Sequence, residues 1–155
     1  MHFSTWKEGK MGKYFGTDGF RGEANVNLTV EHAFLVGRYI GWYFGQEHKA
    51  QVVIGKDTRR SSYMFEYSLV AGLTASGADV YLLHVTPTPS VSYVVNREEF
   101  DCGIMISASH NPYYDNGIKI INGKGYKLEA EVEKLIEEYI DGVGEEIPFA
   151  TGENI

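Results

Sequence analysis

Short apolar runs alternate along this chain with longer segments of helical periodicity. The runs cover residues 51–55, 78–84, 102–107 and 117–121, and turn-forming residues stand close to their ends. Strands that alternate with helices favour a largely parallel sheet, because a helical crossover is the usual connection between parallel strands. The sequence therefore predicts an α/β fold with helices on both faces of one sheet.

The segments between these runs predict four helices. Thr29 is expected to cap the first, which presents an apolar face up to Phe44. Ser61 or Ser62 is expected to cap the second, which should end near Ser76 before Gly77. The third should run from Pro89 through Asn96. The last carries an amphipathic stripe of six residues: Leu128, Val132, Leu135, Ile136, Tyr139 and Ile140.

Three glycines in the first helix repeat every fourth residue, at Gly37, Gly41 and Gly45. Such spacing can pair helices in a membrane, but charged and amide side chains interrupt it here. We therefore expect these glycines to pack closely against the sheet.

Length and composition fit one domain with a sizeable core. The 155 residues are 43% hydrophobic and 23% charged, and no apolar run is long enough to span a bilayer. Cys102 is the only cysteine, so no intrachain disulfide can form, which suits a reducing cytoplasm. Because Cys102 lies in an apolar run, a small core residue is the simpler interpretation than a catalytic thiol.

The net charge of −7 is unevenly placed. Residues 129–155 hold nine acidic side chains and one basic one, whereas residues 1–128 are close to balanced. The first part can therefore form a local cationic site beside an acidic tail. Neither a basic stripe nor a stacking surface is present, so nucleic acid is not an expected partner.

A polar cluster, "SASHNP" at residues 107–112, directly follows the apolar strand 102–107. In open α/β sheets, ligands bind beyond the carboxyl ends of the strands, so this cluster lies where a site is expected. Ser109 is a candidate nucleophile or phosphoryl carrier, with His110 beside it and Lys119 one short turn away. A phosphoryl group on Ser109 would carry nearly two negative charges, which nearby cations would stabilise.

Two further clusters suit an anionic ligand. The segment "FGTDGFRG", residues 15–22, surrounds Arg21 with glycines that would let the backbone approach a ligand. The segment "GKDTRRSS", residues 55–62, places cations beside a helix N-terminus. Each also has a simpler interpretation, as a tight turn and as a solvated helix cap. His84 and His110 lack the spacing of metal ligands.

The order of these motifs, "GTDGFRG", "GKDTR", "PTPS", "SASHNP" and "NGIK", resembles the alpha-D-phosphohexomutase superfamily. The resemblance covers residues 13–140 and is closest to the bacterial phosphoglucosamine mutases. It implies a three-layer α/β/α domain with a four-stranded, mostly parallel mixed sheet, in which "NGIKI" is the antiparallel edge strand. It also implies a phosphosugar substrate.

The same resemblance implies roles for individual residues. Ser109 would carry the phosphoryl group, and His110 and Asn111 would belong to its loop. Lys119 and Arg21 resemble the basic residues of the superfamily that position the phosphoryl group and move protons.

Three more residues are implied to lie in the same cleft. Thr17 and Asp18 would line it, and Arg59 would bind substrate or phosphate, although a domain contact is the alternative for Arg59.

The superfamily uses Mg²⁺, held by an oxygen of the phosphoserine and by three aspartates of a "DGDxDR"-type loop in a second domain. No such string occurs here. Ser109, through its phosphate, would thus be the metal ligand of this chain. The resemblance implies that the chain is the first of four domains and nearly inactive alone.

The expected organisation has three parts. Residues 1–12 are interpreted as a leader or as residues added before a natural start at Met11, residues 13–141 as the phosphoserine domain, and residues 142–155 as a linker toward a second domain. The remaining domains would be its partners, self-association stays open, and the cytoplasm is the expected location.

Two alternatives remain open. The chain could be the first domain of a phosphoglucomutase or phosphomannomutase, because the sugar is chosen by a domain that the chain does not match. It could also be a phosphate-binding or interaction module that reuses the fold without catalysis.

Overall fold

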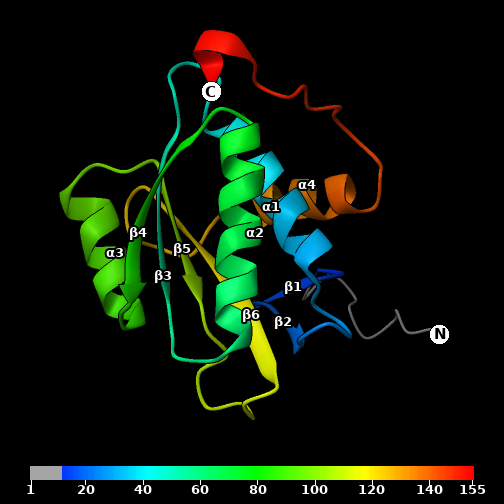
Figure 1. The fold of residues 1–155 in the computed structure, drawn as a ribbon, viewed down its shortest axis with the longest axis vertical. Helices are drawn as coiled ribbons and strands as arrows, with labels where there is room; N and C mark the ends of the chain where they lie inside the picture. Colours follow the sequence, from blue (N-terminus) through cyan, green and yellow to red (C-terminus); the bar gives the residue numbers. More distant parts are fainter. Residues whose placement is uncertain (1–11) are drawn as a thin grey trace.

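The computed structural model describes residues 12–155, so the predicted leader lies outside the described residues except for Gly12 (Figure 1). A six-stranded sheet with the order β1-β2-β6-β5-β3-β4 forms its centre. Its strands are β1 (Phe15–Gly16), β2 (Gly19–Glu23), β3 (Gln51–Lys56), β4 (Asp79–Val85), β5 (Cys102–Ile106) and β6 (Asp115–Asn122). The helices are α1 (Val30–Tyr43), α2 (Ser61–Ala75), α3 (Thr88–Arg97) and α4 (Ala130–Ile140), followed by a short 3₁₀ helix, Gly152–Asn154.

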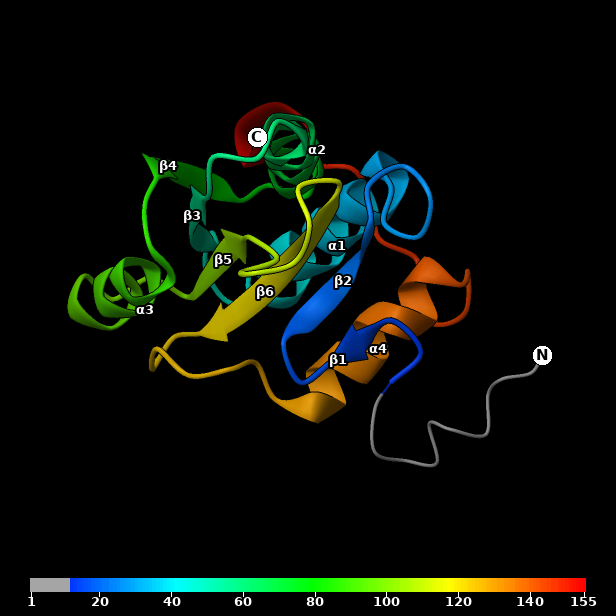
Figure 2. The ribbon, with the colours of Figure 1, turned by 90° about the horizontal axis from the view of Figure 1, so that it is seen from below.

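The predicted three-layer α/β/α architecture is confirmed. Strands β4, β3 and β5 are parallel, while β6 and β2 continue the sheet in antiparallel fashion. Helices α1 and α2 cover one face and α3 covers the other, with α4 beside α1 and β1 (Figures 1 and 2). The larger core lies under α1 and α2, and a smaller core joins α3 to Val53, Met105 and Ile121.

The predicted number of four strands was wrong, because the segment "FGTDGFRG" forms a hairpin that extends the sheet. Strand β2 pairs with β6, so β6 is antiparallel as expected but is not an edge strand. The hairpin is held by Phe15 and Phe20, which are both buried. Glycines between these two aromatic residues hide the alternating pattern that would have predicted a strand.

Of the two predicted N-terminal caps, the cap of α1 was confirmed and the cap of α2 was wrong. Thr29 caps α1, its Oγ1 accepting from the His32 amide at 3.2 Å, and the His32 ring accepts in return from the Thr29 amide. The predicted serine cap of α2 is absent, since the N-cap is Arg60 and makes no side-chain cap bond. The hydroxyls of Ser61 and Ser62 instead bond to groups of the candidate site.

The prediction that the three regularly spaced glycines pack against the sheet was wrong, because Gly37 and Gly41 pack against α2. A Cβ on Gly37 would come within 2.6 Å of the Leu69 carbonyl, and one on Gly72 within 2.2 Å of the Phe34 carbonyl. The third glycine, Gly45, lies just after α1, and a Cβ there would come closest to the carbonyl of Gly41. The two helices therefore touch backbone to backbone, which a side chain at either glycine would prevent.

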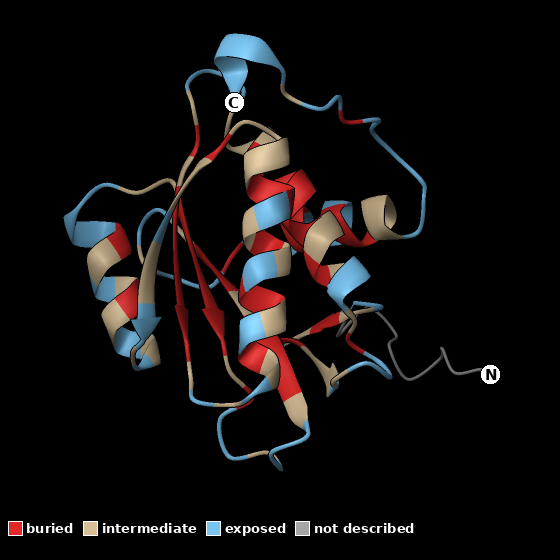
Figure 3. Ribbon diagram, in the orientation of Figure 1, coloured by how far each residue is buried: buried red, intermediate tan, exposed pale blue. Residues whose placement is uncertain are grey.

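The segment after α4 packs back onto the domain. It crosses the outer side of α1, buries Ile147 and ends beside the C-terminal end of α2 (Figure 3). Arg38 of α1, itself buried, donates to the carbonyls of Ile147 and Pro148, and the Ala150 amide donates to Ala75 at 2.8 Å. Among residues 12–155, no helix has the length and apolar character needed to cross a membrane.

Candidate active site

The Ser109 loop, residues 107–114, leaves the carboxyl end of β5 and projects past the sheet (Figure 1). Ser109 is exposed and has a left-handed backbone, with φ of 55°. Its amide donates to Ser107 Oγ at 3.0 Å, and the Asn111 amide donates to the Ala108 carbonyl at 3.0 Å. A non-glycine residue in this conformation costs free energy, so the surrounding contacts must hold it there.

Arg59 reaches this loop from the turn between β3 and α2. One terminal nitrogen, Nη2, donates to the Ser109 carbonyl at 3.1 Å and to the Asn111 carbonyl at 2.7 Å. The other, Nη1, donates to the carboxylate of Asp57. Both terminal nitrogens of the guanidinium are thus engaged within the protein.

Asp57 is the centre of the hydrogen bonds at this turn. It accepts from the Arg59 amide at 3.0 Å and from Ser62 Oγ at 2.8 Å, besides the Arg59 guanidinium. Burial by itself would raise the pKa of the Asp57 carboxyl, but these bonds and one from Ser107 outweigh it and lower the pKa. Asp57 is therefore ionised near neutral pH and offsets the charge of Arg59.

Asn116 ties strand β6 to the start of α2. Its side chain is buried and donates to Ser61 Oγ at 2.8 Å and to Ser62 Oγ at 3.1 Å. Its amide oxygen accepts from the Gly117 amide at 2.8 Å. Because Ser62 also bonds to Asp57, Asn116 and the Ser109 loop belong to one polar network.

Arg21 and Lys119 approach from the neighbouring strands β2 and β6. Arg21 lies opposite Gly117, where a Cβ would come within 2.9 Å of the Arg21 side chain and 2.7 Å of the Ser107 carbonyl. Glycine at 117 thus leaves room for Arg21 beside the start of the Ser109 loop. The Arg21 Nε is buried and has no hydrogen-bond partner within residues 12–155. Lys119 lies two residues after Gly117 on β6, opposite Met105 of β5, and is half-buried.

The remaining predicted residues are placed less centrally. Thr17 and Asp18 are exposed and form the turn between β1 and β2, whose next residue, Gly19, lies against Lys119. His110 is exposed in the Ser109 loop. The register of the hairpin therefore brings Thr17 and Asp18 to the Lys119 side of the site and not beside Ser109.

The described residues contain no group of three or more His, Cys, Asp or Glu side chains that could hold a metal ion. The donor set of residues 12–155 therefore does not fit a resident Mg²⁺ on its own. Cys102 is fully buried, and burial raises the pKa of its thiol well above the ordinary range, with Asp101 adding to the effect. Cys102 is thus a core residue, as its apolar surroundings in the sequence indicated.

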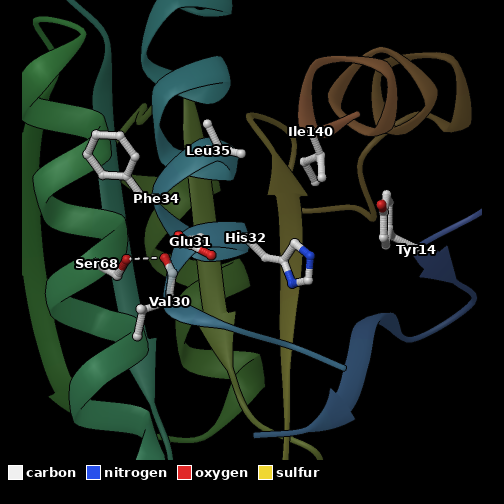
Figure 4. Close-up of a pocket in the computed structure, with 8 residues that line it drawn as sticks. All are labelled: Tyr14, Val30, Glu31, His32, Phe34, Leu35, Ser68 and Ile140. Atoms are coloured by element: carbon white, nitrogen blue, oxygen red, sulfur yellow. Dashed lines mark hydrogen bonds between the residues drawn. The ribbon is translucent and has the colours of Figure 1, made fainter. Parts of the chain in front are cut away.

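A hollow of about 530 Å³ lies elsewhere, between α1, α2 and α4 (Figure 4). Its lining includes Tyr14, His32 and Ile140, and none of the predicted site residues. Burial lowers the pKa of His32 there, and the ring is also used to cap α1. We assign the candidate site to the Ser109 loop because Arg59 contacts Ser109 and Asn111 there and Arg21 lies beside its first residue.

Several residues of the site were missed at the level of sequence: Asp57, Ser62, Ser107 and Asn116. Asp57 is part of the motif "GKDTR", but this motif was interpreted from its cations alone, so the acid that pairs with Arg59 was given no role. Asn116 stood inside "NGIK" and carries no charge that would have signalled a role. A search for short polar residues next to buried strand ends would have found both.

The fold and the site together define an α/β/α domain with an exposed serine in a loop at the carboxyl end of β5, held by Arg59, and with Arg21 on the neighbouring strand β2. Ligands bind beyond the carboxyl ends of strands in open α/β sheets, and arginines are common in phosphate sites. The sequence profile described as phosphoglucomutase/phosphomannomutase, alpha/beta/alpha domain I, matches residues 12–146. The chain belongs to this family.

Individual relatives support this placement. The chain is 83% identical over 145 residues to a phosphoglucosamine mutase of Lachnoclostridium phytofermentans, covering 94% of this chain and 32% of that protein. It is 50% identical over 146 residues to a phosphoglucosamine mutase of Clostridioides difficile, with 94% and 33% covered. A solved phosphoglucomutase/phosphomannomutase family protein of Burkholderia thailandensis superposes with a TM-score of 0.69 at 26% identity, covering 83% of this chain and 30% of that one. The chain spans about a third of the length of these relatives.

Proposed function

We propose that this chain is the phosphoserine-bearing portion of a phosphoglucosamine mutase, which interconverts glucosamine 6-phosphate and glucosamine 1-phosphate. The observation that carries the proposal is the Ser109 loop, which presents an exposed serine in a left-handed turn beyond β5, with Arg21 beside its first residue. The relatives with the highest identity named above are phosphoglucosamine mutases, which supports glucosamine as the sugar.

In the proposed reaction, a phosphoryl group moves from Ser109 to a free hydroxyl of the sugar phosphate. The bond between Ser109 Oγ and phosphorus breaks, and a bond between the sugar oxygen and phosphorus forms. The proton of the sugar hydroxyl passes to a base, and Ser109 Oγ takes up a proton from a general acid as it leaves, which restores the serine hydroxyl. The product is a sugar bisphosphate, which reorients in the site and returns its other phosphoryl group to Ser109 Oγ. Such transfers depend mainly on positioning and on the stabilisation of charge.

The nearby residues would supply that stabilisation. Arg21 and Lys119 would bind the phosphoryl oxygens and assist proton transfer, and His110 and Asn111 would contact the substrate from the loop. Thr17 and Asp18 would line the Lys119 side of the cleft. Arg59, assigned at the level of sequence to phosphate binding, is considered separately below.

Mg²⁺ belongs to this proposal as a cofactor of the longer protein. When bound, it would offset phosphoryl charge. In this chain the oxygens of a phosphorylated Ser109 would be its ligand, and the aspartates would come from another domain. The same proposal makes the rest of the longer protein the partner of residues 12–155, with residues 142–155 leading toward it. The cytoplasm is the proposed location of the longer protein.

A phosphoglucomutase or phosphomannomutase is the alternative, favoured by the family name and by the solved structure at 26% identity. That structure is much less similar to this chain than the glucosamine relatives are. Comparing turnover of glucosamine, glucose and mannose 6-phosphates by the longer protein would decide between them.

The test of the proposal is Ser109→Ala in the longer protein that contains this chain. Mutase turnover should fall about a thousandfold or more, because the phosphoryl carrier is removed. Intact-mass measurement after incubation with a hexosamine 1,6-bisphosphate and Mg²⁺ should show one phosphoryl increment in the parent and none in the variant. Near-normal turnover by the variant would exclude the phosphoserine role.

A further inference from the structure

We propose that Arg59 is a positioning residue that, oriented by Asp57, holds Ser109 in its left-handed conformation, and that it does not bind the phosphoryl group. The inference rests on the proposed function because it takes Ser109 as the phosphoryl carrier. It assigns to Arg59 a role in the loop in place of the role in phosphate binding that its charge suggested.

The first step is the conformation of Ser109. A φ of 55° is uncommon for a serine and persists only where the surroundings over-determine it. Within the loop, the bond from the Ser109 amide to Ser107 Oγ is one constraint. The other constraint on the Ser109 peptide comes from outside the loop, through its carbonyl, and Arg59 supplies it.

The second step is the geometry of the guanidinium. A single nitrogen, Nη2, joins the carbonyls of Ser109 and Asn111, at 3.1 and 2.7 Å, so it bridges the two sides of the turn. Nη1 is held by Asp57, which is fixed in turn by the Arg59 amide and by Ser62. The planar, rigid fork of arginine allows this double attachment, which a lysine ammonium on a flexible stem does not reproduce.

The third step concerns charge. Asp57 pairs with Arg59 and offsets the positive charge that a phosphoryl group would otherwise feel. The Arg59 side chain is only 12% exposed, and its Nε is buried without a partner within residues 12–155. Arg59 is therefore enclosed, and the positive charge that remains for a dianionic phosphoryl group belongs to Arg21 and Lys119.

It follows that the loop is organised before any phosphoryl group arrives. Ser109 Oγ would face the cleft in the unphosphorylated protein, and transfer would not have to include the cost of forming the turn. A phosphate-binding Arg59 makes the opposite prediction, since the loop would then keep its shape without the arginine and lose affinity for phosphate.

The experiment compares the 155-residue chain with Arg59→Met and Arg59→Lys by NMR. Three-bond couplings and carbon shifts of Ser109 report its φ, and hydrogen exchange of the Asn111 amide reports the closing bond to Ala108. Arg60→Met is the matched control, because it makes the same change at the next residue, which is exposed. Titration with inorganic phosphate, followed by the same signals, measures anion binding.

In both Arg59 variants we expect Ser109 to leave the left-handed region and the Asn111 amide to exchange at least about tenfold faster, the factor associated with a lost hydrogen bond to a charged group. Arg60→Met should leave both signals unchanged. A left-handed Ser109 in Arg59→Met, with or without weaker phosphate binding, would overturn the inference. Failure of both Arg59 variants to fold would also overturn it, because Arg59 would then support the whole domain.

These readouts involve no phosphoryl transfer, so they are independent of the test of the proposed function. An active Ser109→Ala would exclude the phosphoserine role, but the effect of Arg59 on the conformation of the loop could still be measured. An unchanged loop in Arg59→Met would exclude the positioning role of Arg59 but would leave Ser109 as the proposed carrier.

Discussion

Two arginines in this domain hold irregular segments by donating to main-chain carbonyls, and they do so in opposite surroundings. Arg38 lies inside, 2% exposed, and fastens the segment after α4 to the middle of α1 and to the C-terminal end of α2. Arg59 lies at the edge of the candidate site and fastens the Ser109 loop to the start of α2. The two arginines act at opposite ends of α2, since Arg38 donates to Ala75 and Ser76 and Arg59 lies just before Ser61.

Their charges are balanced differently. Arg59 is paired with Asp57, whereas Arg38 has no carboxylate within ion-pair distance among residues 12–155. Arg38 is stabilised instead by carbonyls, by Ser76 Oγ at 2.7 Å and by the ring of Phe149, 3.9 Å from the guanidinium carbon. A fully buried cation with only dipoles around it is costly to disturb, whereas Arg59 is slightly exposed and its charge is paired, so changing it should cost the fold less.

The comparison teaches that the two ends of the molecule are specialised. Around Arg38, helices α1 and α2 meet backbone to backbone at Gly37 and Gly72, with no space for adjustment. Around Arg59, short polar side chains and an exposed loop make the contacts. Changes at the first end should therefore reduce the free energy of unfolding, and changes at the second should alter the site.

The largest effect is expected from Gly72→Ala. A Cβ there would come within 2.2 Å of the Phe34 carbonyl and 2.9 Å of the Arg38 amide, so α1 and α2 must separate. We expect a loss of about 3 kcal/mol in the free energy of unfolding, even after the ~1 kcal/mol that alanine gains over glycine in a helix. Urea denaturation measures it, with Ala71→Ser at the adjacent exposed position as the control. A loss below about 1 kcal/mol would show that the helices can move apart freely.

Arg38→Met should come next, at about 2 kcal/mol, because the carbonyls of Ala75, Ile147 and Pro148 lose a charged donor. The segment after Gly142 should also become more sensitive to limited proteolysis than it is in the parent. The same substitution at Arg59 should cost less in global stability. If Arg59→Met proved the more destabilising, the contrast between the two arginines would be wrong.

Asp57→Asn should change the response to acid. The folded pKa of Asp57 lies below its ordinary value of 3.8, so its ionised form stabilises the folded state. That contribution is complete above the ordinary pKa and is lost as the pH falls through the folded pKa. Near neutral pH the variant should be less stable than the parent, and the gap should close as the pH falls below the ordinary carboxyl pKa of 3.8. Urea unfolding at a series of pH values checks this, and a gap independent of pH would contradict it.

Ser109→Ala should have the smallest effect on stability, within about 0.5 kcal/mol, because the side chain is exposed. Its effect on phosphoryl transfer should be the largest of the set. Thermal unfolding of the 155-residue chain gives the first quantity, and the turnover of the longer protein gives the second. A marked loss of stability would mean that the Ser109 hydroxyl has a structural role in the loop.

Much of the fold followed from local patterns. Period-2 and buried apolar runs predicted β3, β4, β5 and β6, and helical periodicity predicted the four helices. The hairpin β1–β2 was missed because its glycines carry no side chain to show a pattern, although Phe15 and Phe20 anchor it in the core. The cap of α2 was wrongly predicted because its serines bond to Asp57 and Asn116 instead. Asn116 is distant in the sequence, and Asp57 was not expected to accept from a serine.

By itself, the sequence determined the α/β class, the placement of Ser109 after a buried strand and the set of cations near it. These depend on neighbours along the chain, where periodicity and turn chemistry act directly. Only the tertiary structure decided that Gly37 meets a helix, that the last residues pack onto Arg38, and that Arg59 donates to two carbonyls of the Ser109 loop. Each of these contacts joins residues far apart in the sequence, and the choice among partners of equal chemistry is made by packing, which no local pattern records.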